Sequence, residues 1–111
     1  MDEDLWALIT ETAALTGLLE ELTAAERAGT PPPPVKEREY LLRRAIVGQL
    51  HFAVSPADPG VAEQARECAD RLRDWDAGHR TSRGAVPAAD PRWGGPEGAR
   101  EYVLQEAEAA A

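Results

Sequence analysis

A stripe of leucines near the start of the chain constrains the fold more than any other feature of the sequence. Five leucines and one threonine follow one another at intervals of three or four residues: Leu5, Leu8, Thr12, Leu15, Leu19 and Leu22. This spacing puts the six side chains on one face of an α-helix, which we expect over residues 2–28. Four more side chains widen the stripe on its two flanks: Trp6, Ile9, Ala13 and Leu18. A face this wide suits burial by two neighbouring elements better than burial by one.

Four consecutive prolines, Pro31 to Pro34, follow this helix and prevent it from continuing. A run of prolines takes the extended polyproline conformation, in which four residues span about 12 Å. We interpret residues 30–34 as a stiff connector that carries the chain to an adjacent helix running back. A ligand for a proline-recognition domain is the alternative interpretation.

Two further long helices are predicted after the connector. Residues 35–54 carry the most apolar face of the chain, so we place this helix at the centre of the fold, with its arginines on the opposite, solvated side. Asp58 and Pro59 suit the N-cap and the first turn of a third helix over residues 58–77. Gly78 is the expected C-terminal cap of that helix.

The rest of the chain predicts a loop and one short helix. Residues 79–95 have almost no periodicity, and residues 96–109 form an alanine-rich, weakly amphipathic helix. The fold class expected for residues 1–111 is all-α, a small antiparallel helical bundle of three main helices plus the long loop and the short C-terminal helix. Its core should be thin, because 21 residues are alanine while Leu, Ile, Val and Phe together number 20.

The chain is strongly acidic. Asp and Glu number 20 against 12 Lys and Arg, which gives a formal net charge of −8. This charge repels phosphate backbones and acidic membrane surfaces, and no apolar run is long enough for a membrane helix. The acidic start, Met1 to Asp4, lacks the positive charge of a signal peptide, and the single cysteine, Cys68, cannot form an internal disulfide. We therefore expect a cytoplasmic protein, and the heavy use of alanine and arginine indicates a bacterium with a GC-rich genome.

Metal and cofactor sites find little support in the sequence. Helical bundles that hold metals often place a Glu three residues before a His, but Gly48 precedes His51 at that distance and Asp76 precedes His79. Cys68 falls on the apolar side of its helix, where a free cysteine behaves as a small hydrophobic residue. We expect no metal and no cofactor.

Glu63, Glu67 and Asp70 line one side of the third helix. The segment from Glu67 to Asp70 resembles half of the magnesium-binding pattern of all-helical nucleotide pyrophosphatases, in which Glu-Glu-x-x-Glu on one helix faces Glu-x-x-Asp on the next. The resemblance implies a nucleotide hydrolase with a magnesium site. The first half of the pattern is incomplete, because Ala24 stands where its third Glu belongs. A solvated helix face is the simpler interpretation.

Arg44 and His51 are seven residues apart and stack on nearly the same side of the second helix. They resemble the Arg-x4-6-His signature of helical ribonucleases from bacterial toxin systems, although Ala45 replaces the polar residue that usually follows the arginine. The resemblance implies a nuclease. With Arg38 and Arg43 they could also form a basic strip for nucleic acid, which glutamates interrupt. A salt-bridged arginine beside an exposed histidine is the alternative.

Two groups of side chains are candidates for contact with a protein partner: Trp6, Ile9 and Leu18 beside the leucine stripe, and Arg83, Arg92 and Trp93 in the long loop. The first group exceeds what a single amphipathic helix needs to bury. In the second, an aromatic side chain beside arginine is typical of interaction hot spots, although Trp93 could instead cover the thin core.

The function expected from these patterns is a non-catalytic protein–protein interaction module. It would be a small regulatory or accessory subunit that binds another protein or itself, as a homo-oligomer. The alternatives are an enzyme, either a helical nuclease or a nucleotide hydrolase, and a nucleic-acid-binding regulator that works through the second helix.

Overall fold

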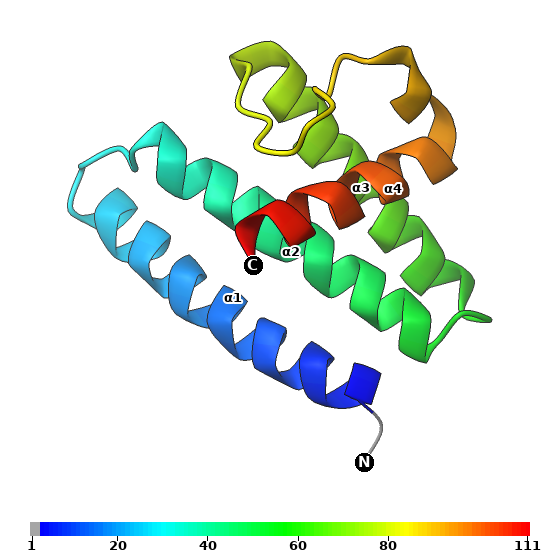
Figure 1. Cartoon of the computed structure of the whole chain (residues 1–111). Coiled ribbons are helices and arrows are strands. Elements are labelled where there is room, and N and C mark those ends of the chain that lie inside the picture. The colour runs from blue at the N-terminus through cyan, green and yellow to red at the C-terminus, as the bar shows by residue number, and fades with distance from the viewer. Residues whose placement is uncertain (1–2) are drawn as a thin grey trace.

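The computed structural model describes residues 3–111, which fold into four α-helices (Figure 1). They are α1 (Glu3–Arg27), α2 (Pro34–Val54), α3 (Pro59–His79) and α4 (Gly95–Ala110), with one 3-10 turn, η1 (Pro91–Trp93), before α4. No strand is present in this part of the chain, so the all-α prediction is confirmed. The predicted helix start at residue 2 lies outside the described residues. Within residues 3–111, no helix has the length and apolarity needed to cross a membrane.

Glycine and proline set the connection between α1 and α2. Gly29 has a φ of 73°, and the N–H of Thr30 donates a 2.9 Å bond to the carbonyl of Ala25. Glycine adopts this left-handed helix end without strain. Pro34 is already part of α2, at a position where its missing amide hydrogen has no helical partner to lose. The extended connector therefore ends at Pro33, one residue earlier than predicted.

The end of α3 differs from the prediction. The helix continues through Gly78 to His79, and Arg80 is the cap, with a φ of 55°. Residues other than glycine rarely take this left-handed conformation. Here the turn brings Thr81 back toward α3, where its hydroxyl donates a 2.6 Å bond to the carboxylate of Asp76. This helix end therefore uses bonds from Arg80 and Thr81 to Asp76 in place of a glycine cap.

α2 lies at the centre of the arrangement. α1 runs along one side of α2, α3 runs along another side, and α4 crosses α2 and α3 (Figure 1). Within residues 3–111, no Cα atom of α1 comes within 8 Å of one in α3 or α4. The core lies between α2, α3 and α4, and Leu42, Leu72, Trp93 and Tyr102 belong to it. α1 contributes Leu18 alone to the buried residues of this part of the chain.

Small side chains let α2 and α3 approach each other closely. Ala45, Ala65 and Ala69 are almost completely buried, and a Cβ atom on Gly48 would lie 3.2 Å from the Cα atom of Ala65. Close packing of backbones removes the space that large side chains would otherwise fill. The alanine-rich composition is thus compatible with a packed core.

A second close approach involves Gly98 in α4, where an added Cβ would lie 2.5 Å from the carbonyl carbon of Trp93. We expect Gly98→Ala to lower the free energy of unfolding by about 1–3 kcal/mol, because the backbone itself must shift. Gly78→Ala is the matched control. Nothing lies within 4 Å of a Cβ at that helical position, so alanine there should add about 0.5–1 kcal/mol. Chemical denaturation of both variants checks this, and equal effects of the two substitutions would contradict it.

Candidate interaction surface

Three helices each bury one charged side chain in the core. Arg38 comes from α2, while Asp76 of α3 and Glu106 of α4 are 1% and 0% exposed. The Nε and Nη2 atoms of Arg38 each donate a 2.9 Å bond to Asp76, and Nη2 also donates a 2.7 Å bond to Glu106. Charge-assisted, bidentate bonds of this kind are strong and directional. They fix the relative positions of α2, α3 and α4.

Two hydroxyl groups complete the surroundings of Asp76. Tyr102 and Thr81 each donate a 2.6 Å bond to its carboxylate. Burial by itself would raise the pKa of Asp76, but the bonds from Arg38, Thr81 and Tyr102 outweigh burial and hold this pKa below its ordinary value. Burial and the bond to Asp76 raise the pKa of the Tyr102 hydroxyl far above its ordinary value. At neutral pH, Asp76 is therefore ionised and Tyr102 is protonated.

Glu106 holds the loop that follows α3. Its carboxylate accepts the amide hydrogens of Arg83 at 2.6 Å and Gly84 at 2.8 Å. Farther along the loop, Ser82 Oγ accepts the amide hydrogen of Ala88 at 2.9 Å. The buried carboxylate of Glu106 consequently fastens this part of the loop to α4.

The buried network has no free position for a ligand. Each oxygen of the Asp76 and Glu106 carboxylates already accepts at least one hydrogen bond from the protein. Placing Arg38 on the solvated side of its helix was wrong, because it is buried. A signal was present, since each charged residue lies four positions from a buried residue of its own helix: Arg38 from Leu42, Asp76 from Leu72 and Glu106 from Tyr102.

Arg44 and His51, the candidate nuclease pair, line one cavity of about 390 Å³ between α2 and the start of α3. Arg44 donates a hydrogen bond to the side-chain oxygen of Gln64, and His51 is exposed. Asp58 lines the same cavity, but its carboxylate accepts the amide hydrogens of Gly60 and the next residue as the N-cap of α3. The structure thus brings Arg44 and His51 together without a carboxylate that is free to assist them.

The three candidate carboxylates of α3 do not converge. Glu63 and Glu67 are exposed, and Asp70 accepts a 3.0 Å bond from Arg73. Across residues 3–111, no group of three or more His, Cys, Asp and Glu side chains is arranged to hold a metal ion. These carboxylates therefore have the geometry of a solvated helix face.

The candidate partner residues of α1 divide into exposed and buried ones. Trp6 and Ile9 are about half exposed, whereas Leu18 is buried. In the loop region, Arg83 and Arg92 are at the surface. Trp93 is buried instead, and its ring packs edge-on against Tyr102 with 5.6 Å between centroids. Trp93 therefore contributes to the core, which leaves Trp6 and Ile9 as the large apolar side chains of this set that a partner can reach.

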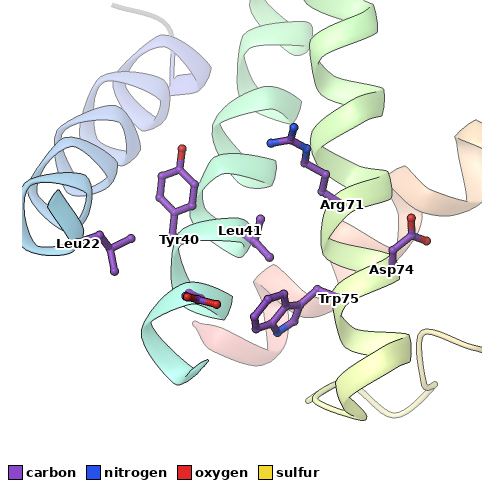
Figure 2. Close-up of a pocket in the computed structure, with 7 residues that line it drawn as sticks. Leu22, Tyr40, Leu41, Arg71, Asp74 and Trp75 are labelled. Atoms are coloured by element: carbon purple, nitrogen blue, oxygen red, sulfur yellow. The ribbon is translucent and has the colours of Figure 1, made fainter. Parts of the chain in front are cut away.

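An open cavity of about 580 Å³ lies between α1, α2 and α3, as Figure 2 shows. Trp75 is the apolar residue of its α3 side and stacks on the His79 ring, with 3.9 Å between the ring centroids. The other apolar side chains that line it come from α1 and α2, and charged side chains stand among them. The lining outside Trp75 comprises Leu22, Tyr40 and Leu41 together with Glu37, Arg71 and Asp74.

Two further cavities continue from this one along α2 and α3. Neighbouring cavities share lining residues, first Tyr40, Leu41 and Arg71, then Arg44 and Gln64. We call the three cavities together the central groove. Along α2 it extends from Glu37 to His51, which is about 21 Å at the helical rise of 1.5 Å per residue.

The buried network sets one end of the central groove. Arg38 follows Glu37 in α2, and Asp76 follows Trp75 in α3, so each network residue is adjacent to a groove residue. The two hydrogen bonds between Arg38 and Asp76 therefore fix how α2 and α3 align at the end of the groove that Glu37 and Trp75 line.

The central groove itself was not predicted, because its lining is drawn from three helices that are distant in sequence. The available signal was the leucine stripe of α1, whose width indicated two neighbours. Comparisons of the chain with protein-family models, with curated proteins and with solved structures found no match.

Proposed function

We propose that this protein is a non-catalytic protein–protein interaction module, a regulatory or accessory subunit in the cytoplasm of a bacterium with a GC-rich genome. In this proposal α1, α2 and α3 form an incomplete antiparallel bundle. The partner, another protein or a second copy of this chain, binds along α1 and the central groove and completes the bundle.

The incomplete burial of the α1 leucine stripe supports this proposal. None of its leucines is buried: Leu19 is 48% exposed, and intermediate exposure is found for Leu5, Leu8, Leu15 and Leu22. α1 packs on α2 alone among the described helices, although its apolar face has the width for two neighbours. Covering apolar surface favours association by roughly 25 cal/mol per Å² removed from water. The partner would supply the second neighbour that covers the apolar face of α1.

A helical nuclease is the second candidate, because Arg44 and His51 line one cavity. In that case the purified protein would cleave RNA, and His51→Ala would abolish cleavage while leaving the fold intact, since His51 is exposed. An interaction module has no such activity to lose. The bond from Arg44 to Gln64 and the capping role of Asp58 favour the interaction module.

Photo-cross-linking tests the proposed function. A photoreactive amino acid replaces Leu19 in the full chain, inside the cells that naturally produce it, and Glu101 in α4 is replaced in the control. Both side chains are exposed, so both variants should fold. We expect an adduct of one defined mass from position 19 and none from position 101.

The size of the adduct identifies the kind of partner, because a second copy doubles the mass of the chain. Light scattering of the purified protein measures self-association independently. Helical protein that gives no adduct from position 19 and remains a monomer would contradict the proposed function.

A further inference from the structure

We infer that the central groove binds one amphipathic helix with basic flanks, contributed by a different protein. This inference rests on the proposed function and names the chemistry of the partner.

The groove has the length of a short helix. Its length along α2, about 21 Å, corresponds to roughly fourteen helical residues. α1 and α3 lie on two sides of α2 with no Cα atom of one within 8 Å of the other, and the groove runs along α2 between them. α4 packs against a different face of α2, the one that carries Arg38 and Gln49. A fifth helix could therefore occupy the groove without displacing any helix of the fold.

The apolar lining suits a helix that carries an apolar stripe. Tyr40, Leu41 and Trp75 line the cavity at one end of the groove, and Leu22 lines it from α1 (Figure 2). The other leucines of the α1 stripe continue from Leu22 at helical spacing. A partner helix with apolar residues at i, i+3, i+4 and i+7 presents a matching stripe.

The charges around this lining are predominantly acidic. Among the groove residues, four are acidic and two are basic: Glu37, Asp58, Glu67 and Asp74 against Arg44 and Arg71. α1, which forms one side, carries six acidic side chains and one basic side chain, and two of the six, Glu11 and Glu21, pair with Arg43 and Lys36 of α2. An acidic rim attracts a cationic partner over distance and disfavours an anionic one.

A second copy of this chain does not supply such a helix. Acidic side chains outnumber basic ones in α1 (six to one), in α3 (five to three) and in α4 (four to one). α2 has the opposite balance, with four basic and two acidic side chains, but it lies at the centre of the fold and Arg38 is buried. Two copies would also each bring a net charge of −8. The charge pattern therefore favours a different protein.

Two synthetic peptides of about 16 residues test the inference. They share one leucine stripe at helical spacing, and their flanking positions are all lysine in one peptide and all glutamate in the other. Binding to the full chain is measured by fluorescence anisotropy at near-physiological salt. We expect the lysine peptide to bind at least about tenfold more tightly than the glutamate peptide.

Charge-matched variants show whether the groove is responsible. Glu67→Gln with Asp74→Asn neutralises two groove carboxylates, and Glu101→Gln with Glu108→Gln neutralises two exposed carboxylates of α4. We expect the groove pair to weaken binding of the lysine peptide about fivefold and the α4 pair less than about twofold. Leu19→Ser and Leu104→Ser form the corresponding apolar pair, because both leucines are exposed and only the first belongs to the α1 stripe.

Equal weakening by the two charge-matched pairs would overturn the inference, because net charge alone would then attract the peptide. Equal affinity for the two peptides, or no binding of either, would overturn it as well. A dimer that Leu19→Ser dissociates would show that a second copy covers α1 beside the groove, which overturns the inference while the proposed function stands. A monomer that gives no cross-link from position 19 means that the proposed function has failed too.

Discussion

Arg38→Ala should lower the free energy of unfolding by about 3–5 kcal/mol, which is the usual effect of removing one partner from a buried ion pair. The substitution leaves Asp76 and Glu106 buried without a cation and removes three hydrogen bonds. Most of the loss comes from the two uncompensated carboxylates. Domains of this size are stable by about 5–15 kcal/mol in total. The variant should therefore be close to its unfolding transition at ambient temperature.

Chemical denaturation followed by circular dichroism measures this loss. Arg43→Ala is the matched control, because Arg43 is in the same helix and bonds to Glu11 at 3.2 Å but is about one-third exposed. A pair screened by water should contribute no more than about 1 kcal/mol. If the two alanine variants lose the same stability, then the buried network does not hold the three helices together.

Acidification should destabilise the protein below about pH 4. Burial alone would raise the pKa of Asp76 in the folded protein, but the hydrogen bonds from Arg38, Thr81 and Tyr102 together outweigh burial and hold this pKa below its ordinary value. A group with a lowered folded pKa contributes its full stability above the pKa of the unfolded chain, which is about 3.9 for aspartate. That contribution is lost as the pH falls through the folded pKa. Thermal unfolding at pH 6, 4, 3 and 2 should give midpoints that fall steeply over the last two steps.

Two neighbouring variants show whether Asp76 causes this pH dependence. Asp76→Asn removes the titrating group, so it should lower the unfolding midpoint at pH 6 and flatten the decline below pH 4. Asp74→Asn, two residues earlier at an exposed position, should retain the wild-type decline. A decline that is equally steep in Asp76→Asn would assign the acid sensitivity to other carboxylates.

At alkaline pH the dependence is reversed, and the free energy of unfolding should fall as the pH rises. Burial and the bond to Asp76 raise the pKa of Tyr102, so the folded state resists ionisation that the unfolded chain undergoes near pH 10. Stability is fully present below that pH and is lost above it. The same network therefore limits the protein at both ends of the pH range.

The helices were predictable because their signals are local. The 3–4 spacing of α1, the prolines before α2 and the Asp58-Pro59 start of α3 each depend on a few neighbouring residues. The end of α3 was predicted less accurately than the helix starts. α3 passes Gly78, and Thr81 bonds to the carboxylate of Asp76 just beyond the helix end. That carboxylate is also held by Arg38 and Tyr102 from other helices, which no local rule contains.

The interaction surface was only partly predictable, for the same reason. The sequence shows that the apolar face of α1 is wider than one neighbour needs. This width made Trp6, Ile9 and Leu18 equal candidates for contact with a partner. The direction of α1 against α2 then decides which of them is covered, and Leu18 is. The sequence allowed Trp93 to be either an exposed hot spot or a core residue, because the path of the loop was not predictable. In the structure Trp93 packs on Tyr102 and belongs to the core.

The sequence by itself determined the helical class, the positions of the four helices and the excess of acidic over basic side chains, because periodicity, proline and charge act within or between adjacent turns. The tertiary structure alone decided which side of each helix is covered. It buried Arg38 with two carboxylates from other helices, and it left α1 with one neighbour. The physical reason is that burial of a charge or of a leucine depends on partners supplied by segments that are distant along the chain.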